Sequence, residues 1–320
     1  MIKFPMKHKK LFLPILCALM LGMAAKVQLS DRDIVSQLTH DGRVREYIVH
    51  VPPGYETMKA RPLVMVLHGG GGTMRGQYKL TNETFNRLAD RDGFFVVYPQ
   101  GLGKSWNEGG ADRKGYAREH NIDDVGFFKA LITELEKKYP IDPRKVFSSG
   151  MSNGGLMSIR LACDMPDEIR AIGALTASIP ENLVDMCSEE KPAKSGLLLM
   201  NGTEDPIVPF NGGMIKVFGQ TRGKVVSTEK TLQVWLAKNG CKDVPKVQEL
   251  NDKDPEDGTR VTEYTYDQCS SGAPVVFYKV HGGGHAWPGG WQYLREKRIG
   301  RTSRDIDAAE EVWKFFSSFE

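Results

Sequence analysis

The chain has 320 residues, of which 40% are hydrophobic and 26% are charged, with a formal net charge of +3. This balance is typical of a globular protein that buries a sizeable core, and it argues against a disordered chain. Four of the positive charges are lysines within the first ten residues, and the rest of the chain is slightly acidic. Nothing in the composition indicates a nucleic-acid partner, and we expect none.

The N-terminal residues have the order of a secretory signal peptide. The lysines between Lys3 and Lys10 precede an apolar segment, Leu11 to Met23, and the small residues Ala24 and Ala25 follow it. A membrane-spanning helix needs roughly twenty residues, and this apolar segment is shorter. We therefore expect residues 1–25 to be removed by cleavage near Ala24 or Ala25, with secretion or periplasmic export and no stable membrane insertion.

Four cysteines remain after such a cleavage, an even number in an oxidising compartment. Disulfides are the expected state, and three pairings are open among Cys163, Cys187, Cys241 and Cys269. A zinc site is the competing interpretation, and it is disfavoured because no C-x-x-C or helical H-x-x-x-H spacing occurs. We expect neither a metal nor another cofactor.

Strand and helix patterns alternate along the rest of the chain. The predicted strands are short apolar or alternating runs: Val44 to Val51, Leu63 to Leu67, Phe94 to Tyr98, Lys145 to Ser149, Arg170 to Leu175, Leu197 to Met200, Val261 to Tyr266 and Val275 to Val280. The predicted helices are Asn82 to Asp90, Asp123 to Tyr139, Asn153 to Cys163, Thr228 to Asn239 and Asp307 to Phe316. This alternation predicts a single α/β domain over residues 26–320, with a mainly parallel sheet and helices on both faces. Functional groups then belong at the carboxyl ends of the strands.

A G-x-S-x-G motif, Gly150 to Gly154, lies between a predicted strand and a predicted helix. The chemistry needs the glycines because the chain must turn sharply to present the Ser152 hydroxyl. The motif alone is also compatible with a glycine-rich turn in which the serine only caps the helix. Its context must therefore decide whether Ser152 is a nucleophile.

A glycine-rich loop after the strand Leu63 to Leu67 supplies part of that context. His68 to Gly72 resembles the H-G-G-G loop whose amides stabilise a developing oxyanion. A phosphate-binding loop is disfavoured here because this loop contains neither G-K-[ST] nor a spaced G-x-G-x-x-G. We predict oxyanion donors at the amides of Asn153 and of Gly70, with Gly71 as an alternative to Gly70, and a structural role for His68.

An acid and a base follow in the order expected of an α/β-hydrolase, Ser then Asp then His. Asp205 ends the turn after the strand Leu197 to Met200, and it is preferred to its neighbour Glu204 because Pro206 fixes its backbone. Two histidines follow the strand Val275 to Val280. His285 is preferred to His281 because three glycines precede it and carry it over the edge of the sheet. The predicted chemistry is acyl transfer to water by a serine nucleophile.

At these residues the chain resembles the secreted esterases grouped as poly(3-hydroxybutyrate) depolymerase-like and feruloyl esterase-like, in carbohydrate esterase family 1. The matching segments are Leu67-His68-Gly69, Trp106-Asn107, Asp123 to Phe127, Gly150 to Gly155, Asn201 to Phe210 and Gly283 to Gly289. The segment around His285 is the most specific of these, and it implies that His285 is the base. The resemblance also implies neighbour pairing of the cysteines, Cys163 with Cys187 and Cys241 with Cys269.

The chain departs from that pattern at two positions. Many relatives have Cys in place of Gly70 and His in place of Asn201, which bears on fine specificity and not on the reaction. Three aromatic residues lie beside the motifs, and they either line an aromatic acyl pocket or belong to the core: Trp106, Phe210 and Trp287. The basic stretch Arg295 to Arg304 is either a solvated loop or an attractor of anionic substrates.

The resemblance implies a secreted serine carboxylic-ester hydrolase that acts on soluble esters. The expected substrates are feruloyl, aryl or acetyl esters of plant polysaccharide, or hydroxyalkanoate oligomers. Insoluble polyester is disfavoured because no additional substrate-binding module is present in the sequence. A serine peptidase of the same fold and a catalytically inactive carbohydrate-binding protein are the alternatives. The sequence predicts a small-molecule or oligomeric ester as the substrate, and it does not indicate the oligomeric state of the protein.

Overall fold

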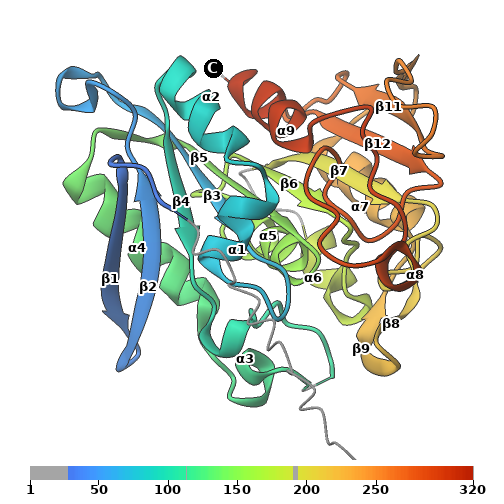
Figure 1. Cartoon of the computed structure of the whole chain (residues 1–320), viewed down its shortest axis with the longest axis horizontal. Coiled ribbons are helices and arrows are strands. Elements are labelled where there is room, and N and C mark those ends of the chain that lie inside the picture. The colour runs from blue at the N-terminus through green and yellow to red at the C-terminus, as the bar shows by residue number, and fades with distance from the viewer. Residues whose placement is uncertain (1–27, 113, 190–193, 320) are drawn as a thin grey trace, which may run out of the picture.

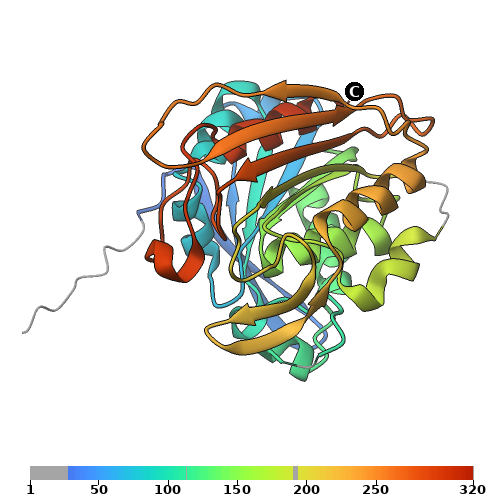
Figure 2. The ribbon, with the colours of Figure 1, turned by 90° about the vertical axis from the view of Figure 1, so that its right-hand side faces the viewer.

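The computed structural model describes residues 28–112, 114–189 and 194–319, and the expected signal peptide lies outside these residues. They form a ten-stranded sheet with helices on both faces, and a separate two-stranded hairpin (Figures 1 and 2). Within the same residues no helix has both the length and the hydropathy to cross a bilayer. This is the mainly parallel sheet with helices on both faces that the alternation of elements predicts.

The sheet has the strand order β1-β2-β4-β3-β5-β6-β7-β12-β11-β10. Its middle runs parallel from β4 to β12, and both ends are antiparallel. The strands are β1 (Asp33–His40), β2 (Arg43–His50), β3 (Arg61–Leu67), β4 (Phe95–Pro99), β5 (Ile141–Met151), β6 (Ala171–Leu175), β7 (Gly196–Gly202), β10 (Lys246–Glu249), β11 (Arg260–Tyr266) and β12 (Val275–His281), with β8 (Gly213–Val217) and β9 (Gln220–Val225) forming the hairpin.

Two hydrophobic cores lie on opposite faces of this sheet. One packs beneath α4 to α7 and the other beneath α1, α2 and α9. The helices are α1 (Met74–Leu80), α2 (Thr84–Asp92), α3 (Tyr116–Glu119), α4 (Asp124–Lys138), α5 (Asn153–Asp164), α6 (Val184–Ser188), α7 (Thr228–Asn239), α8 (Glu296–Ile299) and α9 (Ala308–Ser317). Leu63 to Leu67 and all of β4 are buried. Strands that are covered on both faces need apolar residues throughout, which explains the continuous apolar runs in these two segments.

Side-chain caps fix where three of the long helices begin. The Asp123 carboxylate accepts the amide of Gly126, so that Asp123 precedes α4 and is not its first turn. Ser227 caps α7 and Asp307 caps α9 in the same manner. These caps satisfy amides that have no partner inside the helix.

Every predicted strand and helix has a counterpart, and several short or exposed elements were missed. The strand pattern at β1 was missed because none of its residues is buried, and β10 is exposed throughout. The region between β7 and α7, expected as a connection, contains the β8–β9 hairpin. Short helices such as α1 and α8 were also missed, because one or two turns give little periodicity.

Two disulfides are present in the described residues, one between two helices and one between the end of a helix and a turn of the sheet. Cys163 of α5 is bonded to Cys187 of α6, and Cys241 after α7 is bonded to Cys269, which lies between β11 and β12. These are the neighbour pairs that the family resemblance implies. The second pair anchors the turn before β12, the strand that leads to His285.

Candidate active site

A cavity of about 630 Å³ lies at the carboxyl ends of the parallel strands. Its wall includes the glycine loop after β3, Ser152 after β5 and His285 after β12, so three predicted site segments meet in it. A second hollow, of about 870 Å³, opens at the amino ends of the strands, and none of the predicted site residues lines it. The chemistry is therefore to be sought in the first cavity.

Ser152 has a strained backbone, with φ 56° and ψ −123°, between β5 and α5. A side chain with a Cβ seldom adopts such angles, and packing holds it there. A Cβ on Gly154 would lie 2.5 Å from the Leu67 carbonyl oxygen, so only glycine lets α5 approach β3 this closely. The sharp turn presents Ser152 to the cavity while its amide donates to the Leu175 carbonyl at 2.9 Å.

His285 and Asp205 are hydrogen-bonded to each other and almost completely buried. Nδ1 of His285 is 2.8 Å from Oδ2 of Asp205, while Oδ1 of Asp205 accepts the amides of Ile207 and Val208 at 2.8 and 2.9 Å. The acid thus has a fixed orientation, and its bond to Nδ1 directs Nε2 of the ring away from it.

The structure distinguishes between the two candidate carboxylates and between the two candidate histidines that the sequence offers. Glu204 is exposed, whereas Asp205 is buried against His285. His281 contacts the hydroxyl of Thr262 through Nε2 at 2.9 Å and does not line the cavity. The expected choices, Asp205 and His285, are the members that the structure brings together.

The glycine loop lies directly against the start of α5. A Cβ on Gly70 would be 3.6 Å from the Asn153 Cβ, which places the two expected amide donors on adjoining segments. The Gly71 amide already donates to the Lys104 carbonyl at 2.8 Å, which favours Gly70 over Gly71 as the available donor. Asn153 is the first residue of α5, where amides lack intrahelical partners and the helix dipole favours negative charge.

His68 holds this loop through both ring nitrogens. The Gly101 amide can only donate, so Nε2 of His68 accepts from it at 3.0 Å and Nδ1 donates to the Gly69 carbonyl at 2.8 Å. Burial lowers the pKa of His68 to about 4, so the ring is neutral at physiological pH. This is the structural role that the sequence predicts for it.

A buried polar network supports Asn153 from the side. Its amide group accepts from the Trp106 amide at 2.7 Å and donates to Glu108 at 2.9 Å. Burial raises the pKa of Glu108, while the Arg118 guanidinium, 3.1 Å away, acts in the opposite direction. The start of α5 is thereby fixed to the segment 106–118.

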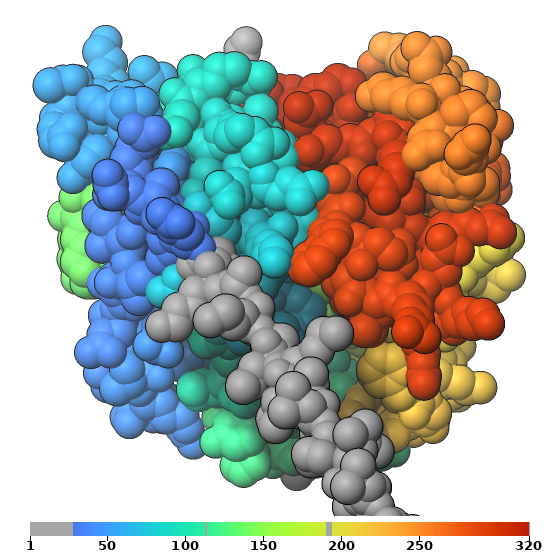
Figure 3. Space-filling view, in the orientation of Figure 1, coloured from blue at the N-terminus to red at the C-terminus, as the bar shows by residue number. Residues whose placement is uncertain are grey.

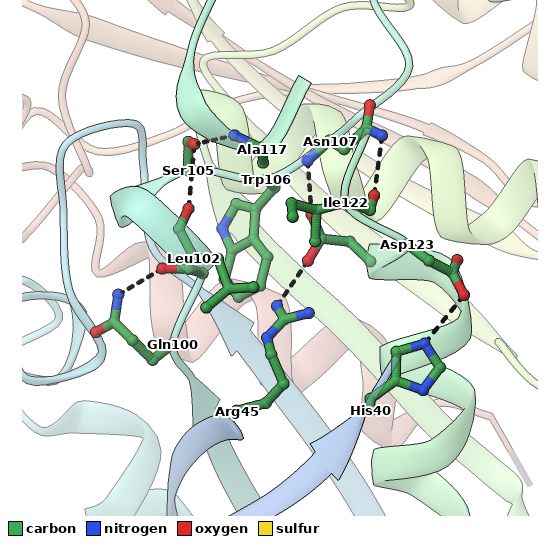
Figure 4. Close-up of polar contacts among 12 residues, drawn as sticks. His40, Arg45, Gln100, Leu102, Ser105, Trp106, Asn107, Ala117, Ile122 and Asp123 are labelled. Atoms are coloured by element: carbon green, nitrogen blue, oxygen red, sulfur yellow. Dashed lines mark hydrogen bonds and ion pairs between the residues drawn. The ribbon is translucent and has the colours of Figure 1, made fainter. Parts of the chain in front are cut away.

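That segment is itself anchored to the first core. The Asn107 amide donates to Asp124 at 2.7 Å, and Asp124 forms a buried ion pair with Arg45 at 2.6 Å. Figure 4 shows these contacts beside the bonds from Asn107 to Ile122 and from Ala117 to Ser105. The segment 105–107 is consequently held at three points.

The three aromatic residues offered as an acyl pocket do not line the cavity. Trp106 is buried against Phe128 and donates its ring N–H to the His68 carbonyl at 2.8 Å. Trp287 is buried against Phe85, and Phe210 packs near Phe277. Of the two interpretations that the sequence left open for these residues, these contacts favour packing against the core over an aromatic acyl pocket.

Other residues form the outer wall, and most were missed. They include Ile215, Val217 and Phe218 of the β8–β9 hairpin, and Tyr293, whose hydroxyl donates to the His285 carbonyl at 3.0 Å. Burial raises the pKa of Tyr293, with Asp205 acting in the same direction, and the phenol stays protonated. The alternation at residues 213–217, followed by Phe218-Gly219, was the signal that could have revealed the hairpin.

In the residues that the structure describes, no three His, Cys, Asp or Glu side chains are grouped as metal ligands. The groups that meet in the cavity are instead a hydroxyl, an imidazole with its carboxylate, and backbone amides. Such a set can activate a hydroxyl as a nucleophile and stabilise negative charge on a substrate oxygen.

Comparison with known proteins gives matches among esterases. Residues 45–185 match the sequence model of the family described as "Esterase PHB depolymerase". The protein named "Putative esterase NocK", of Nocardia uniformis subsp. tsuyamanensis, is 29% identical over 281 residues, which are 86% of this chain and 79% of that protein. Feruloyl esterase B of Piromyces equi is 28% identical over 79% of this chain, and the match spans 45% of its length.

A solved structure shows the same fold. The acetyl xylan esterase from Aspergillus awamori aligns over 89% of this chain and 99% of its own, with a TM-score of 0.58 and 16% sequence identity. At that identity the likeness establishes the α/β-hydrolase fold. The sequence relatives, which are named esterases, confirm the resemblance drawn from the motifs.

Proposed function

Because the chain is a carboxylic ester hydrolase similar to the feruloyl and poly(3-hydroxybutyrate) depolymerase esterases, we propose that it cleaves esters through an acyl-enzyme on Ser152. The observation that carries the proposal is the strained turn at Ser152, in one cavity with the His285–Asp205 pair. A serine that only capped α5 would not need this backbone, and its side chain accepts no capping hydrogen bond.

In this mechanism His285 acts alternately as base and acid, and each other group has one role. Nε2 of His285 takes the Ser152 proton as Oγ attacks the ester carbonyl, and Asp205 stabilises the imidazolium. The amides of Gly70 and Asn153 bind the oxyanion of the tetrahedral intermediate. Collapse breaks the bond to the alcohol, which leaves with the proton from His285. Water, deprotonated by His285, then releases the acid and restores the serine.

The substrates we propose are soluble esters, either feruloyl, aryl or acetyl esters of plant polysaccharide or hydroxyalkanoate oligomers. Relatives named as feruloyl esterases and a neighbour named as an acetyl xylan esterase support this class. The cavity of about 630 Å³ has the size of a small-molecule site.

We further propose that residues 26–320 act as a single exported domain. The disulfides Cys163–Cys187 and Cys241–Cys269 support an oxidising destination, because disulfides rarely persist in the cytosol. The lysine-rich and apolar leader supports the same conclusion.

A hydrolysis panel tests the proposed function. Wild-type protein and Ser152→Ala are assayed on p-nitrophenyl esters, feruloyl and acetyl-xylan esters, hydroxybutyrate oligomers and peptide anilides. We expect Ser152-dependent turnover of esters and none of anilides. Faster turnover of anilides would indicate a peptidase, and no turnover of any ester by folded wild-type protein would indicate a binding protein.

A further inference from the structure

We propose that the cavity selects esters that carry a carboxylate on a part of the molecule remote from the scissile bond. This inference rests on the proposed function and adds the substrate class. The feature behind it is a set of four basic residues on the cavity wall, which we call the cationic wall: Lys104, Lys114, Arg118 and Arg222. Glu108 is the acidic residue of the same lining.

Two of these cations lie on adjoining segments. The Lys114 ammonium donates to the hydroxyl of Thr221, the residue before Arg222, at 2.9 Å. The Arg118 guanidinium donates to the Arg222 carbonyl at 3.3 Å, which holds strand β9 against α3. Lys114 and Arg222 therefore face the cavity from neighbouring stretches of chain.

The charges of the cationic wall are unequally compensated. Arg118 has an exposed side-chain fraction of 8% and is paired with Glu108 at 3.1 Å and Asp112 at 2.8 Å. In contrast, Arg222 donates to the neutral Gln220 side chain at 2.8 Å, and Lys114 to a hydroxyl. Among the residues that the structure describes, no carboxylate lies within ion-pair distance of either cation.

A carboxylate on a bound ester would replace these neutral acceptors. Hydrogen bonds from an ammonium or guanidinium to a carboxylate are about twice as strong as neutral ones. The low-dielectric walls of a cavity also concentrate the field of unpaired cations. Lys114 and Arg222 can both exchange their present neutral acceptors, the Thr221 hydroxyl and the Gln220 side chain, for such a ligand.

The same hairpin supplies an apolar side to the cavity. Ile215 and Val217 of β8 line it, whereas Lys216 between them is exposed and absent from the lining. Ile207, Val208 and Leu294 continue the apolar surface. The preferred ligand is consequently an ester with an apolar chain that ends in a carboxylate, such as an oligoester with a free acid end.

The basic segment around α8 extends the positive field at the mouth. Figure 3 shows the red region that holds α8 directly above the yellow β8–β9 hairpin. The Arg298 guanidinium lies 5.6 Å from the ring of Phe218, at the tip of the hairpin. Of the two interpretations of this basic stretch, attraction of an anionic substrate agrees with the cationic wall beside it.

Matched ester pairs test the inference. One pair places the charge on the acyl group, mono-p-nitrophenyl glutarate against p-nitrophenyl pentanoate. The other places it on the alcohol side, the 3-hydroxybutyrate dimer as free acid against its methyl ester. The measured quantity is the ratio of kcat/KM for the anionic to the neutral ester. We expect Arg222→Gln and Lys114→Gln each to lower this ratio by about tenfold in at least one pair.

Lys216→Gln is the matched control, because it removes a cation from the opposite face of the same hairpin. It should leave both ratios at their wild-type values. Equal ratios in Arg222→Gln, Lys216→Gln and wild type, in both pairs, would overturn the inference. Wild-type protein gives a second test, since raising salt from about 20 to about 500 mM should raise KM for the preferred anionic ester more than for its neutral partner.

Failure of this inference and failure of the proposed function are distinguishable. If only the inference is wrong, neutral esters are still hydrolysed, the activity still disappears in Ser152→Ala, and the ratios do not respond to charge. If the proposed function is wrong, Ser152→Ala retains the hydrolysis of neutral esters, whatever the ratios show.

Discussion

Two regions of the cavity are built in different ways. The reaction edge comprises the turns after β3, β5, β7 and β12, at residues 68–72, 150–155, 203–208 and 282–285, and close backbone contacts at glycines hold it together. The rim comprises residues 103–112 and 114–118, the β8–β9 hairpin and α8, and it is exposed at many positions. Under the proposed function, packing would fix the reacting groups, while short surface elements would carry the contacts to the rest of the substrate.

The largest effect is expected at the reaction edge, where two histidines follow β12. We predict that His285→Ala lowers kcat/KM for esters by about 10⁴-fold or more, because the base and the nucleophile act as a unit. His281→Ala should stay near wild type, since His281 contacts Thr262 outside the cavity. Steady-state kinetics on both folded variants measure this, and equal losses would contradict the assignment of the base.

Substitutions at one glycine in each region compare how strongly the two regions contribute to the free energy of unfolding. Gly154→Ala places a Cβ 2.5 Å from the Leu67 carbonyl oxygen and 2.7 Å from that of His68, and we expect it to cost about 3 kcal/mol or more of unfolding free energy. Gly219→Asn, at the hairpin tip, meets nothing within 4 Å, and asparagine tolerates a φ of 82°. We expect its cost to be below about 1 kcal/mol. Urea unfolding decides, and similar costs would remove the distinction.

The second disulfide tests how far the reaction edge depends on the fold behind it. Replacing both Cys241 and Cys269 with serine should lower the unfolding free energy by roughly 3 kcal/mol, since the bond closes a loop with a sequence separation of 28. Thermal unfolding measures this. We expect turnover at 25 °C to persist, because neither cysteine lies in the cavity. An unchanged melting temperature would contradict the prediction.

His68 predicts a pH dependence of stability. Its pKa is about 4 in the folded protein, against about 6.5 in an unfolded chain, so the unfolded chain binds more protons between these values. The stability that neutral His68 contributes is complete above about pH 6.5 and is lost as pH falls toward 4, by about 2 kcal/mol at pH 5. Urea titrations should therefore show a steeper loss in wild type than in His68→Gln.

The control for this pH dependence is His120→Gln, because His120 is exposed. It should retain the wild-type slope of unfolding free energy against pH. A His68→Gln protein with that same slope would show that protonation of His68 is not what destabilises the loop in acid.

The smallest effect is expected where the rim meets the reaction edge. Glu108 accepts a hydrogen bond from Asn153 and pairs with Arg118, so we regard it as a positioning residue. Glu108→Gln should lower kcat by about tenfold with KM little changed. The reason is that Glu108 holds the Asn153 side chain, and in the proposed mechanism the backbone amide of Asn153 binds the oxyanion of the transition state. Asp112→Asn, which pairs with Arg118 but has no hydrogen bond to Asn153, should have a weaker effect. A rise in KM with unchanged kcat would assign Glu108 to the rim alone.

The reaction edge could be predicted from the sequence, and the rim largely could not. Buried parallel strands give continuous apolar runs, and the turns after them need glycines, so Ser152, Asp205 and His285 stood at identifiable positions. Trp106 and Trp287 could not be assigned from the sequence, because an aromatic residue beside a motif has the same sequence signal in a cavity wall as in a core. The rim depends on which side chains of a short hairpin turn inward, as Ile215 and Arg222 do, and this follows from tertiary packing.

A fluorophosphonate probe tests the central claim most directly, because it forms a covalent bond only with a serine activated for attack. The wild-type protein is labelled at neutral pH, digested and mapped by mass spectrometry. The account predicts a single modified peptide with the label on Ser152, and strongly slowed labelling in Asp205→Asn, in which His285 loses its carboxylate. Ester hydrolysis by a protein that takes no label on Ser152, or labels at another serine, would contradict it.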